Sequence, residues 1–510
     1  MRRGIKLAPF RGMLRNLLAD TVVLAARGDL DRVVSGFSTD SREIAPGQIF
    51  VACPGQKVDG RAFVMTALHN GAAAIICEPP YDLDLPVPLI LVPNARKALA
   101  EVASAYYGHP SRTIGLIGVT GTDGKTTTTH MTAAILRAAG LRVGFLSTVA
   151  VDWSNGSDVN RTSFTTPESP TIQFNLARMR DASAQVVVLE VSSHALTTER
   201  VHTCAFDCAV FTNLDREHLD YHGSFEEYRD AKSRLFKMLE PTNGKPWAKL
   251  GVVNGDDRSS NAMRAASRVP CLDFGFGQDS ALRAVVQSEG THGSQFSLHS
   301  KQGQITIRTR LQGRYNVLNW LAAYGAAANF GANLDAFRHA AANFSGVPGR
   351  LEPLHLGQPY NVYVDFAHTP QGLAVTLDTL RRSSSGRLIA LFGQAGRRDH
   401  GNRARMAEAV ACRADFAVLT TDDPYDEDPQ RILNDLSAAM RAVGRIEGRD
   451  FVAILDRREA IAYAICKAQP RDCILLAGRG PEEVQVIGGE RVALNDTEVA
   501  RQCVKKREAA

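Results

Sequence analysis

The stretch that most constrains the fold lies between residues 113 and 140. The apolar run 113–121 has the length and composition of a buried parallel strand, and a helical pattern begins at Lys125. Between them stands the segment Gly118-Val-Thr-Gly-Thr-Asp-Gly-Lys-Thr126. A strand, a glycine-rich loop and a helix in this order bring backbone N–H groups and a helix N-terminus around phosphate oxygens. The segment therefore predicts a phosphate-binding loop within an α/β sheet.

Two side chains of this loop have expected roles in binding a nucleotide. Lys125 is placed to reach the β- and γ-phosphates, and the Thr126 hydroxyl to ligate Mg²⁺. The spacing departs from the strict form, because Val119 rather than a glycine stands five residues before Gly124. A plain glycine-rich turn is the alternative, and the adjoining Lys-Thr pair argues against it. The residues expected to contact ATP are Gly121, Thr122, Asp123, Gly124, Lys125, Thr126 and Thr127.

The length of the chain predicts more than one domain. A chain of 510 residues exceeds what one hydrophobic core holds and indicates about three domains. Turn-rich stretches at 107–111 and 346–349 are the expected boundaries. The predicted division is an N-terminal domain over 1–110, a central P-loop domain over 111–345 and a C-terminal domain over 346–510.

The pattern of apolar runs predicts an α/β fold throughout. Short apolar runs alternate with helical stretches, which is typical of parallel strands in a doubly wound sheet. The segment 294–311 differs, because its alternating residues about Gln302-Gly303 predict an antiparallel hairpin. Strands are expected near 142–147, 185–190 and 209–213, and within 361–367, 387–393, 416–420, 451–455 and 473–478.

Composition excludes several classes of protein. The net charge of +5 is far too small for this length to indicate nucleic-acid binding, and it fits anionic small-molecule partners. No run approaches the roughly 20 apolar residues of a membrane span. Asp20 interrupts the basic N-terminal stretch before a signal-peptide core forms, although a transit peptide stays an alternative. The nine scattered cysteines indicate reduced, mostly buried thiols, and hence a cytoplasmic protein.

Polar residues at the ends of two expected strands are candidates for a metal site. Glu190 ends an apolar strand that, in a P-loop sheet, faces the terminal phosphate, so it is a candidate Mg²⁺ ligand. A helix-capping role is the alternative for this glutamate. His218 and His222 lie in a polar loop after the next strand. Such loops form the ligand site of doubly wound sheets, although a lone histidine is more often structural.

The helix expected after this loop carries an inward-facing lysine. Ser224 and Glu227 have the spacing of a capping box, which predicts a helix beginning at 225. Lys232 follows Tyr228 by four residues and therefore shares its inward face. Two interpretations stay open: the amine extends to solvent, or Lys232 is carbamylated and serves as an anionic ligand.

With these motifs the chain resembles the Mur ligases of bacterial cell-wall synthesis, and within them the MurE type. The resemblance runs nearly end to end. Its motifs are Asp40-Ser-Arg42, Gly118–Thr128, Thr165-Thr-Pro167, Glu190–Leu196 with Arg200, His218-Leu-Asp-Tyr-His222, Lys232, Tyr315–Asn319, Pro348–Glu352, Asp365–Pro370, Gly396–Asp399 and Gly478–Glu482.

The resemblance implies an activity and an architecture. The activity is ATP-dependent joining of a diamino acid to the D-glutamyl carboxylate of UDP-N-acetylmuramoyl-L-alanyl-D-glutamate through an acyl phosphate, in peptidoglycan precursor synthesis. The architecture is three α/β domains that bind the UDP-sugar, ATP and the amino acid in turn, with a Rossmann-like C-terminal domain.

The resemblance also assigns roles to single residues. The implied catalytic residues are Lys125, Glu190, His218 and Lys232, and the implied metal ligands are Thr126, Glu190, His218 and a carbamylated Lys232. Further ATP contacts are Asn316, Arg350, Asp365 and His368. The UDP-substrate contacts are Ser41, Thr165, Thr166, Ser192, Arg200 and Lys232. The amino-acid contacts are Arg398, Asp422, Asp423, Tyr425, Gly478 and Glu482.

Three positions depart from the family pattern. Asp123 replaces the usual asparagine of the loop, and a carboxylate beside phosphates is expected to weaken ATP binding. Tyr425 stands where enzymes that use meso-diaminopimelate carry the arginine of Asp-Asn-Pro-Arg, and Pro481 replaces a histidine. With no guanidinium in a run of acids, L-lysine is expected ahead of meso-diaminopimelate as the acceptor. Arg397, Arg398 or Arg479 could replace the missing contact.

Other functions remain alternatives on the sequence alone. A relative of the MurE type could form an amide bond on another carboxylate in secondary metabolism. A P-loop switch or motor does not need the second metal site predicted between Asn213 and Lys232. A non-catalytic binding protein would not need intact Lys125, Glu190 and His218. The expected partners are the UDP-sugar dipeptide and a free amino acid, with no nucleic acid, no membrane insertion, and a monomeric state.

Overall fold

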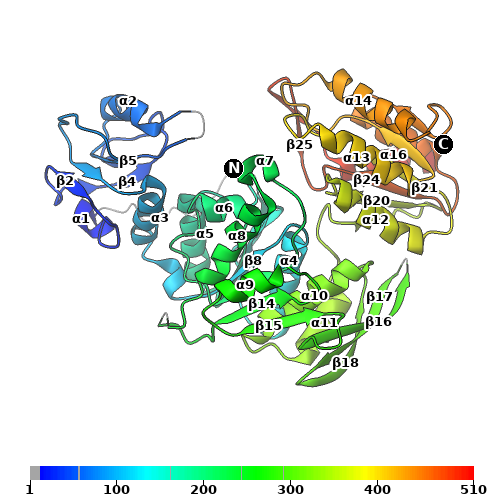
Figure 1. Ribbon diagram of the computed structural model, residues 1–510, viewed down its shortest axis with the longest axis horizontal. Coiled ribbons are helices and arrows are strands. Elements are labelled where there is room, and N and C mark those ends of the chain that lie inside the picture. The colour runs from blue at the N-terminus through cyan, green and yellow to red at the C-terminus, as the bar shows by residue number, and fades with distance from the viewer. Residues whose placement is uncertain are drawn as a thin grey trace. The chain divides into compact units, whose positions relative to one another are not determined.

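The chain divides into two compact units. Their helices and strands are labelled in Figure 1. The computed structural model describes residues 12–55, 58–160, 162, 164–242, 244–290 and 292–509. Unit 1 comprises Met1–Leu282 with Ala322–Ala336, and unit 2 comprises Arg283–Leu321 with Phe337–Ala510. The three-domain division at 110 and 345 stays a prediction.

Unit 1 begins with a five-stranded sheet in the order β2-β7-β6-β5-β4. Its last four strands are parallel and β2 joins one edge antiparallel. Buried apolar side chains cover both faces, which is why the strands are near-continuous apolar runs. The elements are β1 (Gly12–Met13), α1 (Leu14–Leu17), β2 (Ala25–Arg27), β3 (Val33–Val34), β4 (Gly36–Ser38), β5 (Gln48–Ala52), α2 (Val64–His69), β6 (Ala74–Cys77), β7 (Leu89–Leu91) and α3 (Ala95–Tyr106).

The second sheet of unit 1 carries the glycine-rich loop on its central strand. Strands β9, β12, β8, β13, β14 and β15 lie side by side in this order and are all parallel. The expected strands at 142–147, 185–190 and 209–213 are confirmed as β9, β12 and β13. The strands are β8 (Gly115–Thr120), β9 (Val143–Leu146), β10 (Ala150–Asp152), β11 (Ser157–Val159), β12 (Val186–Glu190), β13 (Cys208–Phe211), β14 (Leu250–Asn254) and β15 (Cys271–Gly275).

Helices pack on this sheet and bring their first turns to the carboxyl ends of the strands. Apolar side chains of α5, α8 and α9 share one core with β8, β12 and β13. The Ser224 hydroxyl accepts a hydrogen bond from the Glu227 amide, which confirms the predicted helix start. The helices are α4 (Lys125–Ala138), α5 (Ser169–Asp181), α6 (Ser193–Thr197), α7 (Leu219–His222), α8 (Phe225–Lys237) and α9 (Ser260–Ala266).

Unit 2 contains the predicted hairpin and a second parallel sheet. The hairpin pairs β17 with β18 antiparallel about residues 301–302, as the alternating pattern predicts. In the sheet, β20, β24, β21, β22 and β23 are parallel in this order, and β19 is antiparallel at the β20 edge. The strands are β16 (Leu282–Gly290), β17 (Gly293–Ser300), β18 (Gly303–Thr309), β19 (Glu352–Pro353), β20 (Asn361–Asp365), β21 (Leu388–Phe392), β22 (Phe416–Leu419), β23 (Phe451–Ala453), β24 (Cys473–Ala477), β25 (Val484–Ile487) and β26 (Glu490–Ala493).

Both faces of the unit 2 sheet are covered by helices, so the sheet is doubly wound. Helices α12, α13 and α14 form one core with it and α15 and α16 form another. The expected strands beyond residue 360 are all present. The helices are α12 (Pro370–Ser383), α13 (Gly401–Ala411), α14 (Pro429–Ala442), α15 (Arg457–Lys467) and α16 (Asp496–Glu508), and two further helices, α10 (Arg314–Ala328) and α11 (Leu334–Asn343), contain residues of both units.

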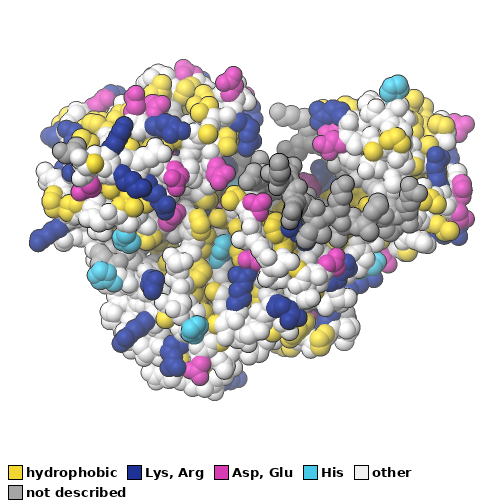
Figure 2. All heavy atoms as spheres, turned by 180° about the vertical axis from the view of Figure 1, so that it is seen from behind, with side chains coloured by type: hydrophobic (Ala, Val, Ile, Leu, Met, Phe, Trp, Pro, Cys, Tyr) yellow, Lys and Arg dark blue, Asp and Glu magenta, His cyan; other side chains and the backbone are white. Residues whose placement is uncertain are grey.

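Three findings bear on what the composition predicts: the distribution of surface charge, the lengths of the helices and the state of the cysteines. Cationic and anionic side chains are interspersed on the face drawn in Figure 2. Among the helices of the described residues, none is long and apolar enough to cross a membrane. All nine cysteines are free thiols; four are buried, and Cys412 and Cys466 are exposed.

Candidate active site

The glycine-rich loop is shaped by glycines and anchored to the end of strand β13. Gly124 has φ +79°, a conformation that favours glycine, and a Cβ at Gly121 would collide with the Thr212 hydroxyl. The amide of Thr122 donates to the Asn213 carbonyl at 2.9 Å, and that of Asp123 donates to the Asn213 side-chain oxygen at 2.9 Å. The loop is therefore held open in the form that surrounds phosphates, next to the first turn of α4.

Two lysine amines converge on this loop. Lys125 Nζ donates to the carbonyl oxygens of Gly121 at 3.0 Å and Thr122 at 2.6 Å. Lys232 Nζ reaches the same Gly121 oxygen at 2.7 Å from helix α8. The Lys232 side chain is 1% exposed, so the alternative in which it extends to solvent is wrong. Burial, and then the charge of Lys125, lower the pKa of Lys232 well below its ordinary value.

A buried glutamate connects the loop helix with the neighbouring strand end. Glu190 pairs with Val119 across β12 and β8, so it stands beside the loop. Its carboxylate accepts hydrogen bonds from the hydroxyl of Thr126 at 3.0 Å and from the amide of Thr148 at 2.7 Å. Glu190 is 1% exposed. A hydroxyl and a carboxylate in contact offer the oxygen donors that Mg²⁺ prefers.

His218 joins the lysines from the loop after β13. Its ring lies 6.1 Å from that of Tyr228, and its Nε2 is 3.6 Å from a carboxylate oxygen of Glu217. Burial lowers the pKa of His218 to about 4, and the nearby charges of Lys125 and Lys232 act in the same direction. The imidazole is therefore neutral near pH 7, which is the form that ligates metals.

Three of the candidate UDP-substrate residues form one hydrogen-bonded group. The Thr166 hydroxyl donates to the Glu190 carbonyl at 2.8 Å and accepts from the Ser192 amide at 2.9 Å. Arg200 donates to the Thr166 carbonyl at 2.8 Å and pairs with Glu168 at 2.9 Å. The group adjoins the carboxyl end of β12. Of the other three candidates, Lys232 contacts the glycine-rich loop, Thr165 is half-buried beside the group, and Ser41 is buried in the turn after β4, where its carbonyl accepts from Asn70.

In unit 2, three of the four further ATP candidates gather around Phe366. The Arg350 guanidinium lies over the Phe366 ring at 4.5 Å, and His368 Nδ1 is 2.7 Å from the Phe366 carbonyl oxygen. Asp365 accepts the amides of the residues at 351 and 367. Asn316, near the start of α10, donates to the Gln312 carbonyl and accepts from the Asn319 amide.

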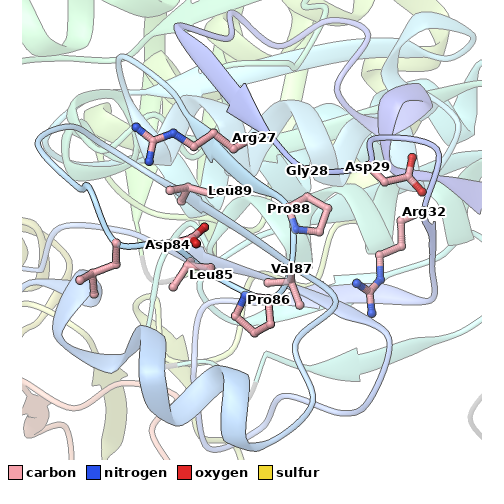
Figure 3. Close-up of a pocket in the computed structure, with 11 residues that line it drawn as sticks. Arg27, Gly28, Asp29, Arg32, Asp84, Leu85, Pro86, Val87, Pro88 and Leu89 are labelled. Carbon is pink, nitrogen blue, oxygen red and sulfur yellow. The ribbon is translucent and has the colours of Figure 1, made fainter.

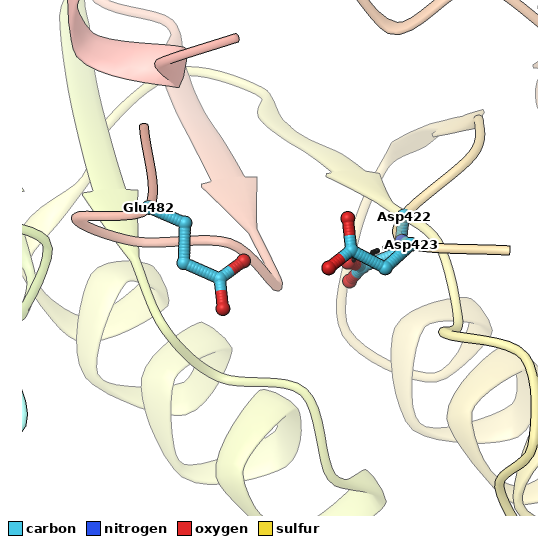
Figure 4. Close-up of side chains that lie close together, drawn as sticks. All are labelled: Asp422, Asp423 and Glu482. Atoms are coloured by element: carbon cyan, nitrogen blue, oxygen red, sulfur yellow. Dashed lines mark hydrogen bonds between the residues drawn. The ribbon is translucent and has the colours of Figure 1, made fainter. Parts of the chain in front are cut away.

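The acceptor candidates form a buried ionic cluster in unit 2. Carboxylate oxygens of Asp422, Asp423 and Glu482 lie within 4.8 Å of one another, and Figure 4 shows Glu482 facing the two aspartates. Arg479 is fully buried among them, 2.5 Å from Asp423 and 3.5 Å from each of the other two. The stretch 421–429 itself carries no guanidinium, but Arg479, one of the three arginines named as a possible replacement, lies among these acids. Arg479 lies 56 residues after Asp423, and only the parallel pairing of the sheet brings them together.

The remaining acceptor candidates lie around this cluster. Burial raises the pKa of the Tyr425 phenol. The negative charges of Asp423 and Glu482 raise it further, and the positive charge of Arg398 lowers it. Gly478 has φ +113°, and a Cβ there would press on the Asp422 carboxylate. Burial raises the pKa of Glu482 to about 7.

Comparison with known proteins identifies the family. Models of the Mur ligase family catalytic domain, the Mur ligase middle domain and the Mur ligase glutamate ligase domain match residues 33–107, 119–327 and 349–480. A UDP-N-acetylmuramoyl-L-alanyl-D-glutamate--2,6-diaminopimelate ligase of Geobacillus thermodenitrificans is 41% identical over 472 residues, 92% of this chain and 94% of the relative. The chain belongs to the Mur ligase family.

Further relatives agree with this assignment. A UDP-N-acetylmuramyl-tripeptide synthetase of Roseiflexus sp. (strain RS-1) is 38% identical and covers 92% of this chain and 94% of the relative. The solved structure of a UDP-N-acetylmuramoyl-L-alanyl-D-glutamate--2,6-diaminopimelate ligase has a TM-score of 0.67 and 30% identity, and covers 98% of this chain and all of the other. As a Mur ligase the chain is an ATP-dependent enzyme that forms amide bonds.

Sequence reasoning missed three residues of this Mur ligase that shape the candidate site. Thr148 donates two hydrogen bonds to the Glu190 carboxylate, one from its amide and one from its hydroxyl. It follows the end of β9, where no sequence motif marks it. The Tyr228 hydroxyl is 3.1 Å from that of Thr122, although its helical spacing indicated only an inward position. Arg457 donates to the Thr421 carbonyl directly before the acid cluster. None of these contacts has a local sequence signal.

A separate pocket of the Mur ligase contains none of the predicted site residues. It has a volume of about 270 Å³ and lies at the β2–β7 edge of the first sheet (Figure 3). Its lining mixes charged and apolar side chains: Arg27, Gly28, Asp29, Arg32 and residues 83–89.

Proposed function

We propose that this Mur ligase joins a diamino acid to the D-glutamyl carboxylate of UDP-N-acetylmuramoyl-L-alanyl-D-glutamate, in peptidoglycan precursor synthesis. The names of the relatives support this substrate. The observation that carries the proposal is the gathering of Thr126, Glu190, Lys232 and His218 around one glycine-rich loop. The chemistry of an amide ligase needs such an assembly, because the carboxylate must be activated before an amine can attack it.

The first step transfers the γ-phosphoryl group of ATP to the substrate carboxylate. An oxygen of the carboxylate forms a bond to phosphorus while the bond to the ADP oxygen breaks. This transfer depends on positioning and on neutralising charge, more than on acid–base chemistry. Lys125, at the loop carbonyls, is positioned to move onto the phosphates. Backbone amides at the start of α4 are proposed to bind the phosphate oxygens.

The donor set of this chain fits Mg²⁺. Thr126, Glu190, His218 and a carbamylated Lys232 would hold the ions, which supply charge neutralisation at the phosphates when bound. The low pKa of Lys232 supports carbamylation, because only a neutral amine attacks carbon dioxide. In that reaction an N–C bond forms, one proton leaves the nitrogen for solvent, and the neutral buried amine becomes a carbamate anion. The anion would balance the bound metal charge.

In the second step the amine of the acceptor attacks the acyl phosphate. A tetrahedral intermediate forms, the C–O bond to phosphate breaks, and the amide remains. Asp422, Asp423 and Glu482 support the binding of an acceptor with more than one ammonium group. Arg350, Asp365 and His368 are the proposed ATP contacts of unit 2.

The acceptor is proposed to be 2,6-diaminopimelate ahead of L-lysine, which reverses the order expected from the sequence. Four relatives at 36–41% identity are named for 2,6-diaminopimelate. An acidic surface without a guanidinium favoured lysine, whereas the structure places the Arg479 guanidinium within that surface.

The test is a phosphate-release assay with ATP, Mg²⁺, the UDP-sugar dipeptide and each amino acid. Phosphate release that requires all components, with a UDP-sugar tripeptide as the product by mass spectrometry, is the expected result. No turnover of the UDP-sugar dipeptide with any diamino acid would overturn the proposal. That result would favour the alternative, in which the enzyme acts on another carboxylate. The departures at Tyr425 and Pro481 from the family pattern are the reason for considering this alternative.

Two further expectations belong to this proposal. A cytoplasmic location fits the proposed substrates, which are a nucleotide-linked sugar peptide, ATP and a free amino acid. A monomeric state stays a prediction, and light scattering of the purified chain would measure it.

A further inference from the structure

An exposed arginine lies beside the acceptor cluster at the position where a family arginine is missing. Tyr425 stands in place of the arginine of Asp-Asn-Pro-Arg. The guanidinium of Arg397 lies over the Tyr425 ring, with its central carbon 5.3 Å from the ring centroid. Arg397 comes from the loop after β21, and Tyr425 from the loop after β22. The chain therefore carries a cation at this place, delivered from a neighbouring loop.

The backbone holds these two loops together. The Gly396 amide donates to the Asp423 carbonyl at 2.8 Å, and a Cβ at Gly396 would collide with the Pro424 carbonyl oxygen. Arg397 has φ +59° and Tyr425 has φ +54°, a left-handed conformation that non-glycine residues rarely adopt. Strained backbone of this kind persists where the surrounding structure enforces it, and it is frequent at ligand sites. The contact is therefore a property of the fold, and not a chance meeting of two surface side chains.

Arg397 is also more available to a ligand than Arg479, the guanidinium inside the acid cluster. Arg479 is fully buried and lies among three carboxylates, so its charge is already balanced. The side chain of Arg397 is 62% exposed and its ion pair is with Asp426, at 2.6 Å. Exposed pairs of this kind contribute little and exchange partners readily. A substrate carboxylate can therefore take or share the Arg397 guanidinium.

We infer that Arg397 binds the second carboxylate of an acceptor that carries two, and so determines specificity for a 2,6-diamino dicarboxylic acid over L-lysine. This rests on the proposed function. The acid cluster attracts an ammonium group and Arg397 attracts a carboxylate. Both are near Tyr425, because the charges of Asp423 and Glu482 act on its phenol and the Arg397 guanidinium lies over its ring. A distal carbon that bears both groups matches this pair of charges. The distal end of L-lysine bears only the ammonium group and leaves Arg397 without a substrate partner.

The test compares two acceptors in wild type and Arg397→Ala. With meso-diaminopimelate, kcat/KM is expected to fall by about tenfold to a hundredfold in the variant, as for a lost hydrogen bond between charged groups. With L-lysine it should stay within about twofold. The double variant Arg397→Ala with Tyr425→Arg should recover the diaminopimelate value, because the guanidinium returns. Arg449→Ala is the matched control, since Arg449 is exposed and pairs with the adjacent Asp450.

Binding of meso-diaminopimelate to the full chain, measured by calorimetry, makes the same comparison without turnover. An equal Kd in wild type and Arg397→Ala, an equal loss for both acceptors, or a wild type that prefers L-lysine overturns the inference. Weaker diaminopimelate binding in the variant supports it even if no UDP-sugar dipeptide is turned over. An absence of UDP-sugar dipeptide turnover counts only against the proposed function.

Discussion

The amine of Lys232 lies 4.3 Å from the centroid of the Tyr228 ring, one helical turn earlier on α8. The same tyrosine reaches the phosphate loop, since its hydroxyl is 3.1 Å from that of Thr122. Tyr228 is 1% exposed, and its ring also contacts those of His218 and His222. One buried side chain therefore connects the loop with the lysine proposed to be carbamylated.

Substitution of Tyr228 should separate these two contacts. Tyr228→Phe keeps the ring and loses a hydrogen bond of about 1 kcal/mol, so the KM for ATP should rise severalfold. Tyr228→Leu also removes the ring beside Lys232, so kcat should fall as well. Steady-state kinetics, with ¹³C NMR of the carbamate in labelled bicarbonate, measure both effects. Equal kinetics in the two variants would contradict the separate role of the ring.

Removal of the Lys232 amine should abolish ligation without unfolding unit 1. Lys232→Ala cannot form a carbamate, and kcat should fall by at least about a hundredfold, as for lost support of a metal site. Added short carboxylic acids should restore part of the activity, because they supply the missing anion. Lys237→Ala, an exposed lysine on the same helix, is the control and should behave as wild type. Near-normal turnover by Lys232→Ala would refute the proposed metal site.

The local parts of the site could be predicted from the sequence. The phosphate loop, the strand that ends in Glu190 and the capped helix that carries Lys232 each have a local pattern, and each was expected where it lies. The roles of these residues in binding metal or nucleotide stay predictions. The sequence named Arg479 only as one of three arginines that could lie at the acceptor site. Its pairing with Asp423 could not be predicted, because the two residues are 56 positions apart and meet only through the sheet.

Replacement of Asp123 by asparagine should strengthen ATP binding. Two hydrogen bonds that position residue 123 use its amide and its carbonyl, which accepts from the Thr212 hydroxyl at 2.6 Å, and asparagine keeps both of these backbone groups. Removing one negative charge near the phosphates should lower the Kd for ATP by a few fold, of order 1 kcal/mol. Calorimetric titration at low salt measures this. A clear loss of affinity in Asp123→Asn would show that the carboxylate supports binding.

The Arg457–Asp496 pair should stabilise unit 2 and the loops that carry the acceptor cluster. Both side chains are fully buried and 2.6 Å apart, and Arg457 also donates to the carbonyls of Thr421 and Ala477, directly before Asp422 and Gly478. Asp496→Asn leaves a buried cation without its anion and should cost about 3–5 kcal/mol of unfolding free energy. Denaturant unfolding measures the change. Arg458→Met, at the exposed neighbour of Arg457, should lower the unfolding free energy by less than about 1 kcal/mol. Equal losses of unfolding free energy in the two variants would contradict a stabilising role of the buried pair.

Acceptor affinity should depend on pH through Glu482. Its pKa is raised to about 7 by burial, with the Asp422 and Asp423 charges acting in the same direction and Arg479 opposing them. Below pH 7 the folded protein holds a proton that the unfolded chain releases near its ordinary pKa of 4.5, so this group's contribution to stability falls as pH rises from about 4.5 to 7. Above pH 7 the carboxylate is charged and attracts an ammonium group. Calorimetric titration should therefore give tighter acceptor binding at pH 8 than at pH 6. The Glu482→Gln variant should bind the acceptor more weakly and lose most of this pH dependence. An unchanged pH profile in the variant would exclude Glu482 as the titrating group.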